Sequence, residues 1–145
     1  MAKFRFRFAS NLRVKQRVEE QKELEYGKAL AALELEKQRK EIMVTERENA
    51  ILSFRESVNK RITPYDLQLK NNYLALLKEN IIKQEKVIIK AEEAAELKRQ
   101  ELVEAMTERK ILDKLKEKDY EEFVKEERLN EQKIQDEIVS YRYNQ

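Results

Sequence analysis

The sequence predicts an all-α protein: two long helices that fold back on each other as an antiparallel coiled-coil hairpin, with the second helix longer than the first. Three observations predict this fold. The 145 residues include one glycine, Gly27, and one proline, Pro64, whereas most domains use several per cent of each for their turns. Good helix formers such as Ala, Glu, Lys, Leu and Arg dominate the chain. After Pro64, apolar residues recur every seven positions, as in a coiled coil.

The high charge content raises the alternative of a disordered chain, because 41% of the residues are charged. Two features argue against disorder. Leu, Ile, Val and Phe account for 39 of the 145 residues (16, 10, 8 and 5), which is above the ~20% below which disorder is expected. The positive and negative charges are interspersed and leave a net charge of +2, so the chain does not repel itself.

One place in the sequence has the features of a helix break. Thr63 is a good helix N-cap, Pro64 is favoured at the first helical position, and Asp66 suits the positive end of the helix dipole. Pro64 also disfavours helical geometry at the residue before it. We therefore predict a single domain over residues 1–145, with a first helix at about 4–60, a turn at 61–64 and a second helix at about 64–142.

The second helix carries a heptad repeat that predicts the coiled-coil seam. One column of this seam reads Leu67, Leu74, Ile81, Ile88, Ala95 and Leu102. The companion column reads Leu77, Gln84, Ala91, Lys98, Ala105 and Leu112. Beyond Leu112 we expect the repeat to slip, because Arg109 and Lys116 would be seam residues, and to resume at Tyr120 and Phe123.

The first helix has a patchier pattern. Its best apolar stripe, which we expect to face the second helix, is Leu24, Ala31, Leu35, Ile42 and Leu52. Three polar residues interrupt this stripe: Gln38, Thr45 and Asn49. Gly27 is expected inside the helix, because helical spacing continues on both sides of it.

A turn centred near Thr63 fixes the register of the hairpin, so that residues i and j face each other where i + j is near 126. This rule brings together the aromatic residues of the two ends, Phe4, Phe6, Phe8, Tyr120 and Phe123. It also places Arg5 and Arg7 near Glu121 and Glu122. The charges of the two ends are complementary. The first twenty residues hold six basic and two acidic groups, and residues 113–140 hold six basic and ten acidic groups.

The unequal helices leave an overhang on the second one. If Met1 lies near Lys125, roughly 20 residues extend beyond it, over roughly 30 Å. The overhang carries its own apolar stripe, formed by Ile134, Ile138 and Tyr141. An apolar stripe without an intramolecular partner usually binds another chain.

The residue types exclude most catalytic and cofactor chemistry. The chain has no Cys and no His, which removes thiol chemistry, disulfides and the usual zinc sites. It has no nucleophile motif and no phosphate-binding glycine loop. Its many Glu and Lys residues at helical spacing are typical of a solvated, salt-bridged face. We therefore expect no enzymatic activity, no metal and no cofactor.

Nucleic acid and membranes are not expected partners. Arg alternates with Phe from Phe4 to Phe8, but the net charge is near zero and no basic stripe follows either helix. The longest apolar run, Tyr73 to Leu77, is far below the ~20 residues that span a membrane. The N-terminus also lacks the apolar core of a signal peptide. A chain without Cys fits a cytoplasmic protein.

Over nearly its whole length, the sequence resembles the flagellar FliJ family. At the N-terminus the resemblance rests on Phe-Arg-Phe-Arg-Phe (residues 4–8) and Leu12, and in the second helix on Tyr73 to Leu77, Ile81 and Gln84. The best match is the Glu-Arg-Lys-Ile-Leu-Asp-Lys-Leu-Lys-Glu block from Glu108 to Glu117, followed by Glu122, Phe123, Glu126, Glu127, Asp136 and Glu137.

This resemblance implies a non-enzymatic, cytoplasmic component of the bacterial flagellar type III export apparatus, peripherally associated with the inner membrane and required for flagellum biogenesis and motility. It implies a fold similar to the stalk subunit gamma of rotary ATP synthases. The implied role is a central stalk that binds the hexameric export ATPase, promotes its assembly and activity, contacts the export gate membrane protein and escorts export chaperones.

The resemblance also suggests site residues. The paired chain ends would enter the ATPase ring, with the candidate contacts Phe4, Phe6, Phe8, Phe123, Ile134, Ile138 and Tyr141. The candidate contacts to the export gate are Tyr73, Leu77, Ile81 and Gln84, although Leu77 and Ile81 fit the seam of the hairpin equally well.

Three alternatives remain open from the sequence. The chain fits the equivalent stalk of a virulence injectisome, and it also fits a generic coiled-coil scaffold that dimerises between chains. A prefoldin-like holdase fits less well, because prefoldins place β-hairpins between their helices and the break at Thr63-Pro64 leaves no room for strands.

Overall fold

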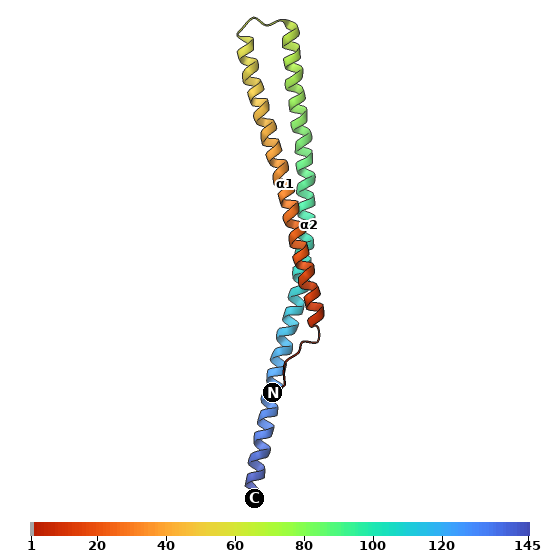
Figure 1. The fold of residues 1–145 in the computed structure, drawn as a ribbon, viewed down its shortest axis with the longest axis vertical. Helices are drawn as coiled ribbons and strands as arrows, with labels where there is room; N and C mark the ends of the chain where they lie inside the picture. The colour runs from red at the N-terminus through yellow and green to blue at the C-terminus, as the bar shows by residue number, and fades with distance from the viewer. Residues whose placement is uncertain (1) are drawn as a thin grey trace. The chain divides into compact units, whose positions relative to one another are not determined.

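The computed structural model, which describes residues 2–145, contains two α-helices and no strand within that range. Helix α1 spans Ala9–Val58 (50 residues) and helix α2 spans Pro64–Tyr143 (80 residues). The two helices form a hairpin, with α1 running from red to yellow and α2 from green to blue in Figure 1. The predicted all-α hairpin with a longer second helix is therefore confirmed.

The predicted break at Thr63-Pro64 is confirmed in its details. Pro64 is the first residue of α2. The Asp66 backbone amide donates to the Thr63 hydroxyl (3.2 Å), and the Leu67 amide donates to the Thr63 carbonyl (3.1 Å), so Thr63 is the N-cap of α2. Helix α1 ends at Val58, slightly before its predicted end. None of the described residues has a positive φ, so this turn is made without glycine.

The start of the first helix differs from the prediction, because α1 begins at Ala9 rather than near Phe4. The residues before it alternate in burial: Phe4, Phe6 and Phe8 are buried or half-buried, whereas Lys3, Arg5 and Arg7 are exposed. This two-residue period is typical of an extended chain with one side against a surface, and Arg7 and Phe8 then form the turn that leads into α1. Phe is also a weaker helix former than the residues that follow.

The contacts divide the hairpin into two compact sections. The open end comprises the N-terminal residues up to Lys22 together with Leu102–Gln145, and the turn section comprises Glu23–Glu101. Each section is described by itself.

In the turn section, the predicted seam of α2 is confirmed. Leu77, Gln84, Ile88 and Ala95 are buried, and the other seam positions are half-buried except Leu67, which is exposed. At the open end the expected slip is seen at Lys116, which is exposed while the adjacent Leu115 is half-buried. Arg109 differs from the expectation, because it is half-buried at its seam position. Arg109 can occupy a seam position because its charge is paired there.

The predicted seam of α1 is wrong. Leu24, Ala31, Leu35, Ile42 and Leu52 are all exposed. The residues that are half-buried lie two positions further along and repeat in steps of three and four: Tyr26, Ala29, Leu33, Glu36, Lys40, Met43, Arg47, Ala50, Phe54 and Ser57.

Polar side chains hold part of this seam in register. The Gln84 side-chain amide donates to the Glu36 carbonyl (2.9 Å) and carboxylate (2.6 Å). Lys40 forms an ion pair with Glu85 (3.4 Å), and Lys98 forms one with Glu25 (3.2 Å). Charged side chains can therefore face α2, because their aliphatic stems cover the small Ala positions while their charges find partners.

Candidate protein-interaction site

At the open end, Phe4 meets Tyr120 and Phe123 as predicted, whereas the ring contact of Phe6 and Phe8 is with each other. The Phe4 ring lies 5.4 Å from the Tyr120 ring, nearly edge-on, and 5.5 Å from the Phe123 ring, measured between centroids. Phe6 and Phe8 stack edge-on at 5.9 Å, and Phe6 is 8% exposed. Phe4, Tyr120 and Phe123 form an aromatic cluster, since such distances and angles are those of favourable aromatic pairs. Of the candidate ring-binding residues, Phe4, Phe6 and Phe123 are therefore engaged within the chain.

Ion pairs support this cluster, with one correction to the prediction. Arg7 pairs with Asp119 (3.6 Å), whose residue numbers satisfy the predicted register, and not with Glu121 or Glu122. The Arg7 guanidinium also lies over the Phe8 ring, 4.9 Å from its centroid. Asp119 is preferred because it occupies a seam position, whereas Glu121 and Glu122 are exposed.

Further along the open end, charges replace apolar seam residues. Lys15 bonds to Glu108 (2.7 Å), and Arg109 bonds to both Glu19 and Asp113 (2.6 Å to Asp113). The Glu19 carboxylate, followed by that of Asp113, raises the pKa of Arg109, so this cation stays charged in the seam. This part of the hairpin is held by complementary charge around the single buried residue of α1, Leu12.

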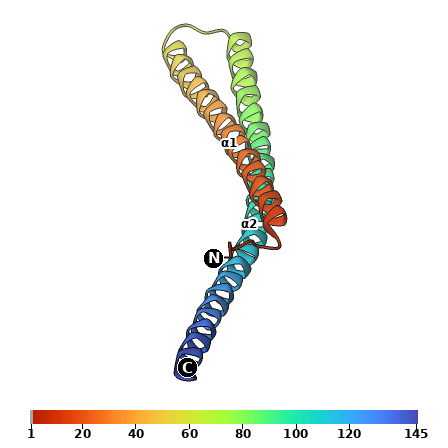
Figure 2. The same ribbon diagram turned by 60° about the horizontal axis from the view of Figure 1, so that its bottom comes forward.

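The end of α2 forms a tip that the rest of the chain does not cover. Every residue from 128 to 145 is exposed, and the dark blue end of α2 has no neighbouring segment in Figures 1 and 2. The predicted stripe stands out on it: Ile134, Ile138 and Tyr141 are 56%, 49% and 67% exposed. The structure therefore leaves these three candidate contacts free to bind a partner.

Sequence reasoning missed other apolar residues of this tip. Leu129, Val139 and Tyr143 are also strongly exposed. Counted at about 100° per residue, they lie on the side of the helix opposite Ile134 and Ile138. Their spacing could have been found in the sequence, because Leu129, Val139 and Tyr143 follow one another in steps of ten and four.

The four candidate gate-binding residues are not equally accessible. Leu77 and Gln84 are buried in the seam and Ile81 is half-buried. Only Tyr73 is exposed, and its hydroxyl lies 3.4 Å from the Glu46 carboxylate of α1. The structure thus assigns three of the four to the packing of the hairpin.

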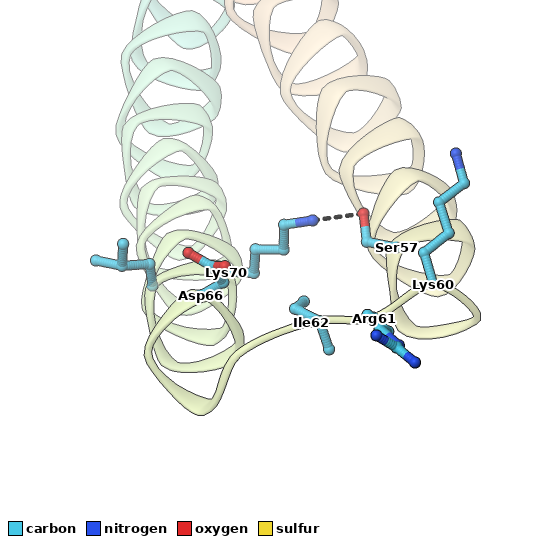
Figure 3. A pocket seen from close by; sticks show the side chains of 7 residues that line it. Ser57, Lys60, Arg61, Ile62, Asp66 and Lys70 are labelled. Carbon is cyan, nitrogen blue, oxygen red and sulfur yellow. Dashed lines mark hydrogen bonds between the residues drawn. The ribbon is translucent and has the colours of Figure 1, made fainter.

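A crevice lies beside the turn, shown in Figure 3. It is an open space of about 340 Å³ lined by Ser57, Lys60, Arg61, Ile62, Asp66, Leu69 and Lys70. Lys70 crosses it to donate to the Ser57 hydroxyl. This bond ties the start of α2 to the end of α1.

Within residues 2–145, no group of three or more acidic or metal-ligating side chains is arranged to hold a metal ion. No helix there is long and apolar enough to cross a membrane.

Comparison with known proteins and protein families identifies the family of this chain. Neither a curated protein nor a solved structure matches it significantly. One family, described as flagellar FliJ protein, matches residues 4–145, which is nearly the whole chain. The match includes the aromatic N-terminal segment, both helices and the exposed tip. The chain therefore belongs to the FliJ family, whose members are non-catalytic components of the flagellar protein export apparatus.

Proposed function

We propose that this protein is the central stalk and chaperone-escort component of the flagellar type III export apparatus. It binds the hexameric export ATPase, promotes its assembly and activity, and couples it to the export gate. Family membership supports the apparatus, and the exposed tip of α2 is the single observation that supports the stalk role.

The tip has the properties needed to enter a ring of subunits. It is one helix of about 10–12 Å diameter with its side chains, narrow enough for a central channel. It presents Ile134, Ile138 and Tyr141 to solvent as one stripe, and an exposed apolar stripe of this kind is typical of a surface that a partner covers. The aromatic cluster of Phe4, Tyr120 and Phe123 would hold the N-terminal segment at the base of this tip.

The gate contact is assigned to the turn section. Tyr73 is the candidate with an exposed ring, whereas Leu77, Ile81 and Gln84 would act by keeping the hairpin packed. Contact with the gate would hold the protein at the inner membrane from the cytoplasmic side, without insertion. The binding surface for export chaperones is not assigned to residues.

The test measures ATP hydrolysis and hexamer formation by the cognate export ATPase with added stalk protein. The test variant is Ile134→Asp/Ile138→Asp, and the matched control is Gln132→Asp/Ser140→Asp, which adds the same two charges on the other side of the same exposed helix. We expect the test variant to lose at least about tenfold in apparent affinity, because two buried apolar contacts are replaced by unpaired charges. The control should behave as wild type.

A truncation after Asn130 complements this test. It removes only exposed residues, so the hairpin should keep its helicity per residue and its thermal transition. Stimulation of the ATPase should be lost. A truncated chain that stimulates as well as the full one, or equal effects of the test and control variants, would refute the stalk role of the tip.

A further inference from the structure

One face of α2 continues from the aromatic cluster into the tip. Counted at about 100° per residue, six residues fall within about 60° of arc. They are Tyr120, Phe123, Glu127, Ile134, Ile138 and Tyr141. We call this the tip face. The chain's own N-terminal segment contacts its first part, through Phe4 on Tyr120 and Phe123, and its second part is exposed.

The N-terminal segment is too short to cover the whole tip face. Residues 4–8 span at most about 18 Å when fully extended. The tip face, from Tyr120 to Tyr141, is about 31 Å long at 1.5 Å per residue. The intramolecular contact therefore occupies one end of a longer face, whose two apolar parts are separated by Glu127.

The segment is held by contacts that a competitor can replace. It lies outside α1, and its backbone joins the start of that helix at Phe6 and Phe8, whose carbonyls accept hydrogen bonds from the Ala9 and Leu12 amides (3.2 and 2.9 Å). Neither of these two bonds is made to α2. Its ion pair, Arg7 with Asp119, is 3.6 Å long and the Arg7 side chain is 67% exposed, a type of pair that contributes little. The remaining contacts are ring packing by Phe4 and burial of Phe6. Ordering five residues opposes them.

This intramolecular contact also identifies the chemistry that the tip face accepts. The segment presents Phe on one side and Lys or Arg between them. The exposed half of the face has the complementary features, because Ile134, Ile138 and Tyr141 are apolar, Glu127 lies among them, and Glu131 and Glu137 flank it.

We propose that residues 4–8 are a displaceable cover on a single binding face of α2, and that the occupant of the whole face is a partner segment with large apolar side chains alternating with Lys or Arg. Such a segment displaces the cover and extends onto Ile134, Ile138 and Tyr141. This is the surface that the proposed function assigns to the ATPase ring. The proposal rests on that function only for the statement that the partner segment belongs to the ring.

The test uses the full chain and peptides, with no ATPase, so its outcome is separate from that of the stalk hypothesis. The first probe is a fluorescein-labelled peptide of residues 2–12. The second is a tandem peptide with two copies of residues 2–8, and the third is that tandem peptide with every Phe replaced by Ser. Binding is measured by fluorescence anisotropy.

The proteins are wild type, a cover-released variant Phe4→Ala/Phe6→Ala, and a control Lys3→Ser/Arg5→Ser in which two exposed residues of the same segment are changed. Phe4 and Phe6 precede α1, and circular dichroism checks that helicity is kept. The residue 2–12 peptide should bind the released variant at least about tenfold more tightly than wild type, because the tethered segment competes at an effective concentration near millimolar. The control should match wild type.

The tandem peptide decides whether the face is continuous. On the released variant the tandem peptide should bind at least about tenfold more tightly than the single peptide. Once its first half is bound, its second half contacts the exposed part of the tip face at a high effective concentration. Adding Ile134→Asp/Ile138→Asp should remove that gain, and the Phe-to-Ser tandem should not bind. Two results for the single peptide would overturn the proposal: equal binding to wild type and to the released variant, or no binding to the released variant. Two results for the tandem peptides would also overturn it: a gain in affinity that survives the two Asp substitutions, or binding of the Phe-to-Ser tandem peptide.

Discussion

Gln84 is the polar residue in the core of the seam, and it illustrates how one side chain sets register. It is 8% exposed and its amide is bonded twice to Glu36 across the hairpin. A leucine at this position would bury more apolar surface but would lose the directional contact.

We predict that Gln84→Leu raises the free energy of unfolding by about 1 kcal/mol while weakening register specificity. Leu77, seven residues earlier in the same column, provides the reverse control, and Leu77→Gln should cost about 2 kcal/mol. Urea denaturation measures the free energies. Crosslinking of Lys40→Cys with Glu85→Cys reports register, and an unchanged crosslink yield in Gln84→Leu would show that Gln84 does not select it.

Gly27 gives a second prediction at this scale. It lies in the interior of α1, has a negative φ, and a Cβ built on it meets no atom within 4 Å. Gly27→Ala should therefore raise the free energy of unfolding by about 1 kcal/mol, because alanine loses less backbone freedom on folding. Thermal denaturation checks this, and a lower melting temperature would mean that helical geometry at Gly27 is strained.

At the scale of elements, the start of α2 depends on its cap. The Thr63 hydroxyl accepts the Asp66 amide, which would otherwise lack an intrahelical partner. Thr63→Ala should cost about 1 kcal/mol of stability, whereas Thr63→Ser should cost little because it keeps the acceptor. Chemical denaturation of the two variants measures the difference, and equal loss in both would point to the Thr63 methyl group instead of the cap.

Substitutions on the two apolar faces of α1 are predicted to change the free energy of unfolding by different amounts. Ile42, on the exposed face, is 68% exposed, and the adjacent Met43 is half-buried against α2. Ile42→Ala should change the free energy of unfolding by less than about 0.5 kcal/mol, and Met43→Ala should cost about 2 kcal/mol. Urea denaturation distinguishes them, and a larger loss at Ile42 would restore the seam predicted from sequence.

These elements show what the sequence could predict. Pro64 and Thr63 located the turn, because local stereochemistry determines it. The α2 seam was found because one apolar heptad dominates that helix. The α1 seam was not found, because α1 carries apolar residues on two heptads offset by two residues, and the heptad that faces α2 also includes Glu36, Lys40 and Arg47. The choice between them depends on pairing with α2, such as Lys40 with Glu85, which a single-helix pattern does not contain.

The candidate site was predictable to a similar degree. The register predicted that Phe4 would meet Tyr120 and Phe123, and the lengths of the helices predicted an exposed tip. The start of α1 at Ala9 rather than near Phe4 was signalled by the alternation of Phe with Arg before it, which is a two-residue period. The helix-forming residues that follow Phe8 masked this signal. Helix propensity is a weak guide at such a position, because tertiary contacts routinely override it.

At the scale of the whole molecule, the proposed cover and the proposed ring contact meet on the same face of α2. The cover and the ring would compete for Tyr120 and Phe123 if both proposals hold. Holding the cover closed should then weaken the action of the protein on the ATPase without touching the exposed tip residues.

This can be measured with Arg7→Cys/Asp119→Cys, joined by a flexible, reducible bis-thiol crosslinker; the native chain has no Cys that could react. The crosslinked protein should need at least about tenfold more stalk for half-maximal ATPase stimulation, because the binding-competent open state is depleted. Reduction should restore stimulation in the same sample, which separates the lock from any effect of the two substitutions. If locked and reduced protein stimulate equally while Ile134→Asp/Ile138→Asp does not stimulate, the ring engages only the exposed half of the face and the cover stays in place during the catalytic cycle.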